Sequence, residues 1–207
     1  GQNVLWKTVD GGDNWQSLSS DYAVWNDIYF FDGLNGLATR FDSIWTTSDG
    51  GVTWQENDAV KGSKIHEHNG NIMVFGTGFQ FNVHQSTDQG LSWTSKPIST
   101  DYRDVYSIIS VGNHMIMAGE GIVYQSWNDG DSFSQTQKGL RFGELKTIAF
   151  GNDLNGVVGG ENVLATSDGG VTWTEIQSGW RSNFKDVHLL GNGTGIATRH
   201  NGYYSLT

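Results

Sequence analysis

The eight residues TSDGGVTW stand at positions 47–54 and again, unchanged, at 166–173. Three variants of this octapeptide read TVDGGDNW at 8–15, STDQGLSW at 86–93 and SWNDGDSF at 126–133. Successive octapeptides are separated by 39, 39, 40 and 40 residues. A period of this length is typical of propellers that are built from four-stranded blades.

Short apolar runs fill the rest of each repeat. In the second repeat these runs are AVWNDIYFF, LATRF, SIWTTS and VTWQE, and Gly, Asn and Asp residues separate them. Such runs predict β-strands, here named A to D from the innermost outward. No stretch keeps a helical stripe of apolar residues. The sequence therefore predicts an all-β fold: a β-propeller of four-stranded antiparallel blades, in a single domain over residues 1–207 with five octapeptide repeats.

The chain ends decide the predicted number of blades. The N-terminal residues supply a C strand (4–8) and a D strand (14–18), and the C-terminal residues supply strands A (184–190), B (195–200) and C (203–207). We favour a five-bladed ring, in which the C-terminal A and B strands complete a blade with the N-terminal C and D strands. Segment 203–207 is then one strand too many. The alternative is an open fragment of a six- or seven-bladed ring, which would expose two strand edges.

The octapeptide has the composition of a tight turn between strands C and D. Glycine at its fourth and fifth positions permits positive φ, and a carboxylate or amide at its third position can accept hydrogen bonds from the backbone of the turn. The third positions are Asp10, Asp49, Asp88, Asn128 and Asp168. We expect the aromatic eighth residues to be largely buried: Trp15, Trp54, Trp93, Phe133 and Trp173. A calcium or catalytic site needs only one copy of the octapeptide, whereas a turn that serves folding is needed in every repeat. Because the octapeptide occurs five times, we assign these residues a structural role.

Composition excludes several classes of function. The 207 residues carry 12 Lys and Arg against 22 Asp and Glu, a formal net charge of −10, which disfavours binding to nucleic acid. The chain has no cysteine and no long apolar run, so we expect no thiolate site and no membrane insertion. His66 and His68 alternate on a predicted A strand, but no third ligand is identified. We therefore predict no metal and no cofactor.

The octapeptides resemble the Asp-box, or bacterial neuraminidase repeat, with its pattern Ser/Thr-x-Asp-x-Gly-x-x-Trp. The longer unit IYFFDGLNGLATRFDSIWTTSDGGVTW at 28–54 is similar to the photosystem II stability/assembly factor-like family, and so is IAFGNDLNGVVGGENVLATSDGGVTW at 148–173. The resemblance covers nearly the whole chain and implies a β-propeller. It leaves the function open, because Asp-box propellers include sialidases, xyloglucan hydrolases, sorting receptors and assembly factors.

Alternating strand directions divide the connections between two faces. The D-to-A and B-to-C connections share one face, here named the loop face, and the A-to-B and C-to-D turns share the other, the octapeptide face. All five arginines fall on the loop face: Arg40, Arg103, Arg141, Arg181 and Arg199. Aromatic residues adjoin three of them in the sequence: Tyr102, Phe142 and Trp180. Such pairs suit recognition of carboxylate, phosphate or sugar; alternatively, the arginines pair with nearby carboxylates and brace adjacent blades.

Two classes of function remain after this reasoning. The first is a non-catalytic binding or assembly propeller that recognises a protein or peptide on the loop face. The second is a carbohydrate-binding or sialidase-like propeller that uses the same face, although the Phe-Arg-Ile-Pro motif of sialidases is absent. We predict the first, in a monomer. The resemblance to assembly factors and to secreted propellers implies a location outside the cytoplasm, with any signal sequence removed or not included.

Overall fold

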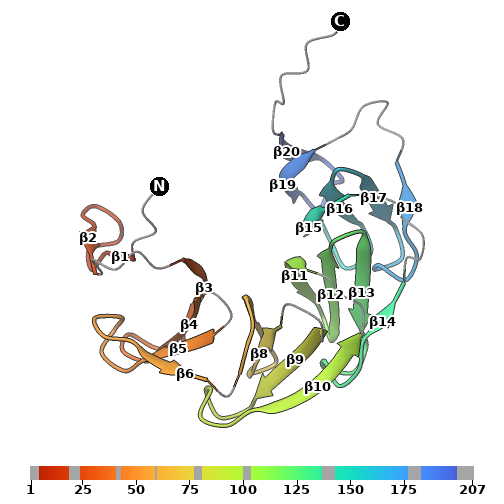
Figure 1. Cartoon of the computed structure of the whole chain (residues 1–207). Coiled ribbons are helices and arrows are strands. Elements are labelled where there is room, and N and C mark those ends of the chain that lie inside the picture. Colours follow the sequence, from red (N-terminus) through yellow and green to blue (C-terminus); the bar gives the residue numbers. More distant parts are fainter. Residues whose placement is uncertain are drawn as a thin grey trace, which may run out of the picture. The chain divides into compact units, whose positions relative to one another are not determined.

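The computed structural model describes residues 5–18, 24–40, 43–58, 60–76, 81–99, 104–136, 143–176 and 183–199 (Figure 1). Within these ranges every regular element is a β-strand. The same ranges contain no helix with the length and hydropathy that crossing a membrane requires. Contacts between Cα atoms divide the chain into two compact units, Gly1–Tyr102 (unit 1) and Arg103–Thr207 (unit 2). The predicted single domain over 1–207 stays a prediction.

Unit 1 contains one two-stranded and two four-stranded antiparallel sheets, in which strands that follow one another in sequence are neighbours. The two-stranded sheet is β1 (Trp6–Lys7) and β2 (Gln16–Ser17). The next is β3 (Trp25–Phe30), β4 (Gly36–Arg40), β5 (Ser43–Thr47) and β6 (Gln55–Asn57). The last is β7 (Lys64–His68), β8 (Asn71–Phe75), β9 (Phe81–Ser86) and β10 (Thr94–Ser99).

Unit 2 repeats this arrangement in the reverse order of sheet size. Its first sheet is β11 (Val105–Val111), β12 (His114–Gly119), β13 (Ile122–Ser126) and β14 (Ser134–Gln135). Its second is β15 (Leu145–Phe150), β16 (Gly156–Gly160), β17 (Val163–Thr166) and β18 (Thr174–Glu175). Its third is the pair β19 (Phe184–Leu189) and β20 (Gly195–Arg199).

The predicted architecture of four-stranded antiparallel blades is confirmed in four complete sheets. The terminal pairs β1–β2 and β19–β20 hold the C and D strands and the A and B strands of their repeats, respectively. The described residues thus contain 20 strands, the number that a five-bladed ring of four-stranded blades requires. Segment 203–207, which the sequence predicts as a surplus strand, lies outside the described residues.

Each octapeptide folds into the same hydrogen-bonded turn. In the second one, the Thr47 hydroxyl donates to Asp49 Oδ1 at 2.9 Å and accepts the backbone N–H of Gly51 at 2.9 Å. Asp49 also accepts the backbone N–H and the hydroxyl of Thr53, at 2.9 and 2.5 Å. The hydroxyl-to-third-residue bond recurs at the other four turns, with Asn128 replacing the carboxylate once. Gly50 and Gly51 adopt φ of 73° and 86°, which only glycine adopts without strain.

The predicted burial of the octapeptide aromatics is right for one residue and wrong for another. Trp173 is 6% exposed and belongs to the core of unit 2, whereas Trp15 is 57% exposed. Trp54, Trp93 and Phe133 are intermediate. Trp93 belongs to a turn that packs on the preceding sheet of unit 1, since a Cβ added to Gly90 would lie 3.1 Å from the Leu37 side chain. Trp15 belongs to the first sheet of unit 1, which has no preceding sheet in that unit.

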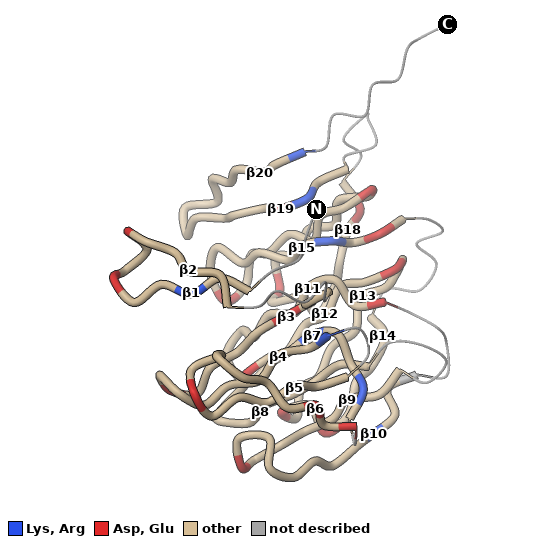
Figure 2. The backbone as a smooth tube through the Cα atoms, turned by 60° about the vertical axis from the view of Figure 1, so that its left-hand side comes forward, with Lys and Arg blue, Asp and Glu red and all other residues tan. Residues whose placement is uncertain are grey.

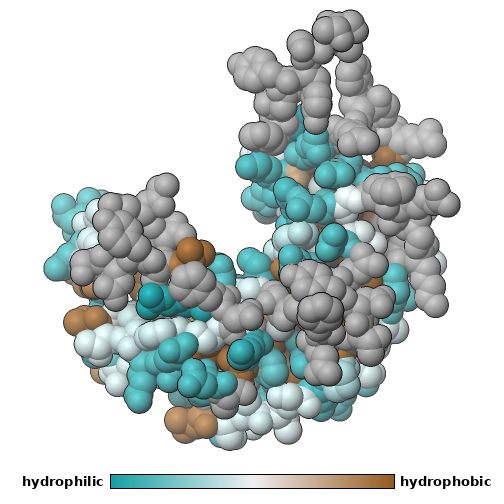
Figure 3. Space-filling view, in the orientation of Figure 1, coloured by the Kyte–Doolittle hydropathy of each residue, from teal (hydrophilic) through white to brown (hydrophobic). Residues whose placement is uncertain are grey.

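Aliphatic side chains of the inner strands form the core of each unit. In unit 1 one cluster contains Leu37, Ile44, Val60, Ile72 and Val74. In unit 2 another cluster contains Ile116, Ala118, Val123, Leu145, Ile148, Val158, Leu164 and Trp173. Along the drawn backbone, acidic residues outnumber basic ones (Figure 2). The face seen in Figure 3 is mostly hydrophilic or intermediate where it is described, and its hydrophobic residues lie in small separate groups.

Candidate functional site

On the loop face of unit 1, Arg40 lies against two tryptophan rings. Its guanidinium carbon is 5.5 Å from the ring centroid of Trp25 and 4.9 Å from that of Trp45. The two indoles are in an edge-to-face arrangement, with ring centroids 6.1 Å apart and planes at 76°. Both guanidinium distances lie within the range of cation–π attraction. The structure thus places one predicted ligand-binding residue, Arg40, in an aromatic cluster.

The register of the sheet brings these three side chains together. Trp25 at the start of β3 is paired with Arg40 at the end of β4, and Arg40 is paired with Ser43 at the start of β5. The Ser43 hydroxyl donates to the Arg40 carbonyl oxygen at 3.1 Å and accepts the indole N–H of Trp45 at 3.0 Å. Trp54 packs on the Trp25 ring, with centroids 5.3 Å apart. The two aromatic rings are therefore held in place by bonds and contacts that do not involve a ligand.

Arg199 occupies the same strand position in unit 2. It ends β20, a B strand like β4, and its register partner is the aromatic residue Phe184. Its side chain is exposed. The other predicted ligand-binding residues are Tyr102, Arg103, Arg141, Phe142, Trp180 and Arg181, all outside the described residues. That these six gather on the loop face stays a prediction.

Carboxylates near the loop face connect neighbouring sheets. Asp27 in β3 accepts the backbone N–H of Ile65 in β7 at 3.0 Å. In unit 2, Asp186 in β19 accepts the hydroxyl of Thr147 in β15 at 3.1 Å. The alternative interpretation of the sequence pairs these carboxylates with arginines of their own loops. Among the described residues, a backbone N–H and a hydroxyl of the adjacent blade donate to these carboxylates. Arg103, Arg141 and Arg181 lie outside the described residues, so the pairing with arginine stays a prediction.

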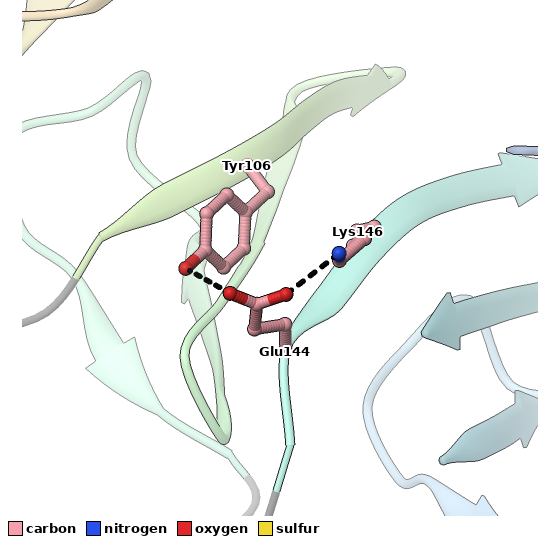
Figure 4. Close-up of polar contacts among 3 residues, drawn as sticks. All are labelled: Tyr106, Glu144 and Lys146. Atoms are coloured by element: carbon pink, nitrogen blue, oxygen red, sulfur yellow. Dashed lines mark hydrogen bonds and ion pairs between the residues drawn. The ribbon is translucent and has the colours of Figure 1, made fainter. Parts of the chain in front are cut away.

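A third brace contains a tyrosine and a glutamate (Figure 4). The Tyr106 hydroxyl donates to Glu144 Oε1 at 3.2 Å, and Lys146 Nζ lies 2.6 Å from Glu144 Oε2. Burial, followed by the nearby negative charge of Glu144, raises the pKa of Tyr106 to about 12. The hydrogen bond from Lys146 lowers the pKa of Glu144. These contacts link β11 to the start of β15.

The alternating histidines of β7 do not belong to a metal site in the described ranges. His68 is 3% exposed, and burial followed by the nearby His68 lowers the pKa of His66. Among the described residues, no group of three His, Asp or Glu side chains is placed to hold a metal ion.

Comparison with known proteins places this fold among propellers. Residues 58–186, more than half of the chain, match the family model described as the DUF6242 beta propeller domain. The chain belongs to this family. A comparison with curated proteins finds no match. The propeller architecture therefore follows from both the strand order and the family.

Several solved structures are similar to this DUF6242 propeller. YCF48 bound to D1 peptide has a TM-score of 0.60 and 17% identity, over 84% of this chain and 59% of that one. YCF48 from Cyanidioschyzon merolae has a TM-score of 0.62 and 17% identity, over 94% and 70% of the two chains. An ancestral GH74 enzyme has a TM-score of 0.73 and 15% identity, over 94% and 31%. The chain thus spans less than two thirds of the first and the third of these structures. Identities this low show the fold alone and confirm the resemblance to assembly-factor-like propellers at that level.

Trp45 is a functional candidate that the sequence interpretation missed, and that interpretation leaves Trp25 outside the predicted site. That interpretation looked for aromatic residues next to each arginine in the chain. Pairing the strands would have found both tryptophans, because a residue directly across a strand pair, or diagonal to it, lies on the same face of the sheet.

Proposed function

We propose that this DUF6242 propeller is a non-catalytic binding module that recognises an acidic protein or peptide segment on its loop face. The observation that carries the proposal is Arg40, held between Trp25 and Trp45. A guanidinium carries planar hydrogen-bond donors, and the two indoles beside Arg40 supply a large apolar contact area. Tryptophan and arginine are also the residues that most often dominate binding at protein interfaces.

Charge supports the choice of an acidic segment. The chain has a net charge of −10, so a positive group on its surface is a local exception that selects where an anionic partner can dock. YCF48, a propeller of similar fold, has been solved with a bound peptide. In this proposal the partner meets a monomer outside the cytoplasm, which size-exclusion chromatography with light scattering and cell fractionation would test separately.

The test uses fluorescent peptides of matched length that carry glutamate, or glutamine in its place. We expect the purified chain to prefer the glutamate peptides, with affinity that falls as salt is added. Arg40→Gln should weaken binding by a factor of about 30 or more, as is typical when a desolvated charged contact is lost. Arg40→Lys keeps the charge but loses the planar fork and should recover only part of the affinity.

Arg199→Gln is the matched control, because Arg199 has the same strand position but an exposed side chain. It should change binding much less than Arg40→Gln. Equal binding of glutamate and glutamine peptides would overturn the choice of an acidic partner. Unchanged affinity in Arg40→Gln would remove Arg40 from the site.

A further inference from the structure

A groove of about 430 Å³ lies on the octapeptide face of unit 1. One wall comes from the sheet β3–β6, including Phe31, Leu37 and Trp54, and the other comes from the octapeptide turn of the next sheet, at 89–91. The volume lies within the range of small-molecule sites. This inter-blade groove lies on the opposite face from Arg40, although Trp54, which lines the groove, also packs on Trp25 of the Arg40 cluster.

The polar lining of the inter-blade groove is uncharged. It consists of hydroxyl and amide side chains, and no lining residue carries an ionisable group. A charged ligand would enter without a counter-charge from this lining, which is unfavourable. The lining therefore favours a neutral ligand that both donates and accepts hydrogen bonds.

Three of these polar side chains are available to a ligand. Within the described residues, the Ser48 hydroxyl and the side-chain amides of Gln55 and Gln89 make no hydrogen bond. By contrast, Thr47 and Thr53 are committed to Asp49 inside the turn. The groove thus combines a fixed frame with free donors and acceptors at its edge.

The backbone at Gln89 is a second and independent observation. Gln89 has φ of 59°, in the left-handed region, at the octapeptide position where three other turns have Gly11, Gly50 and Gly169. A residue other than glycine is disfavoured in this backbone conformation. The strained backbone holds the Gln89 amide at the groove, and strain of this kind is often retained where a side chain has a function.

The corresponding corner of unit 2 is filled. Leu37 is paired with Thr46 in unit 1, and the equivalent strand pair in unit 2 joins Ile116 to Gln125. His114 then replaces Asn35, and Trp127 replaces Ser48. The rings of His114 and Trp127 stack with centroids 3.5 Å apart and planes at 7°. The open groove is therefore a property of particular side chains and not a necessary product of the blade geometry.

We propose that the inter-blade groove binds an uncharged sugar residue. A pyranose presents adjacent hydroxyls that both donate and accept, which the Ser48, Gln55 and Gln89 side chains can satisfy. Its C–H faces fit the apolar surface of Phe31 and Trp54. The proposal goes beyond recognition of an acidic segment and uses the other face, so each can fail without the other.

The experiment measures binding of neutral sugars to the full chain. The probes are the methyl glycosides of glucose, galactose, mannose, xylose and N-acetylglucosamine, together with cellobiose, followed by saturation-transfer NMR and calorimetry. We expect at least one probe to bind with Kd of about 1 mM or tighter, and methyl glucuronide to bind more weakly than methyl glucoside. Absence of binding by every neutral probe at about ten times that concentration would overturn the proposal.

Two variants locate the sugar. Ser48→Trp fills the groove as Trp127 fills its counterpart and should abolish binding. Ser167→Trp makes the same change at the same octapeptide position of another blade and should leave binding unchanged. Gln89→Gly keeps the turn but removes the amide, and we expect affinity to fall about tenfold. Sugar binding that survives both Ser48→Trp and Gln89→Gly would place the site elsewhere and refute the assignment.

Discussion

The inter-blade groove of unit 1 and the equivalent corner of unit 2 have the same strand pairing but different side chains. In unit 1, Asn35, Thr46 and Ser48 leave a groove open, whereas His114, Gln125 and Trp127 fill the corresponding space in unit 2. Gln125 is 1% exposed; it accepts the N–H of His114 Nε2 at 2.9 Å and donates its own N–H to the Gly170 carbonyl oxygen. In unit 2 a hydrogen bond thus links two neighbouring blades at this corner. In unit 1 the equivalent corner stays accessible.

The hydrogen bond from Gln125 to Gly170, here named the tie, accompanies a different bonding pattern in the octapeptide turn at 166–173. In three other octapeptides the indole N–H of the final tryptophan donates to a glycine carbonyl three residues earlier, for example Trp93 to Gly90 at 3.0 Å. In the fifth octapeptide Gln125 occupies that carbonyl, on Gly170. Trp173 Nε1 is then buried without a hydrogen-bond partner among the described residues. Filling the corner therefore exchanges a local bond within one turn for a bond between two blades.

The largest expected difference between the corners concerns their tryptophans. Trp173→Ala should lower the free energy of unfolding by about 3–5 kcal/mol, because a ring that is 6% exposed is removed from the unit 2 core. Trp93→Ala removes a partly buried ring from the edge of the unit 1 core and should lower it less. Urea unfolding of both variants measures this. Equal losses would show that the two corners are packed alike.

Gln125 tests the tie itself. Gln125→Ala removes the acceptor for buried His114 and should lower the free energy of unfolding by about 2 kcal/mol. Thr46→Ala, the matched change at the open corner, should cost about 0.5 kcal/mol or less, because the Thr46 hydroxyl makes one long bond of 3.4 Å. A Gln125→Ala variant as stable as Thr46→Ala would contradict the role of the tie.

Much of this architecture is predictable from the sequence, but the two corners are not. The octapeptide period fixes the blades because each repeat must supply the same turn and the same strands. Whether a corner is open depends on side chains such as Ser48 and Trp127, which occupy a variable octapeptide position and carry no periodic signal. The Arg40 cluster was predicted only in part, since its tryptophans are neighbours across strands and not along the chain.

Lowering the pH should lower the free energy of unfolding through protonation of His114 in the filled corner. Burial lowers the pKa of His114 below 6.5, against the opposing effect of its bond to Gln125. The unfolded chain then binds a proton more readily than the folded one, so stability is full above pH 6.5 and falls as the pH drops below it. Burial also lowers the pKa of His66 and His84 in unit 1, so the response is shared. His114→Asn should reduce the slope of unfolding free energy against pH, and an unchanged slope would exclude His114 as a contributor.

The smallest expected effect is at Gln89, and it has the opposite sign. Gln89→Gly relieves the left-handed backbone at φ of 59° and should raise the free energy of unfolding by about 0.5–1 kcal/mol, after allowing for the extra freedom of glycine in the unfolded chain. Asp129→Gly, at the same octapeptide position with φ of 53°, should gain less, because aspartate tolerates this region better than glutamine. Urea midpoints of the two variants give the comparison. A loss of stability in Gln89→Gly would show that the amide serves the fold. A gain in stability together with weaker sugar binding would mean that the strain at Gln89 is retained for the groove.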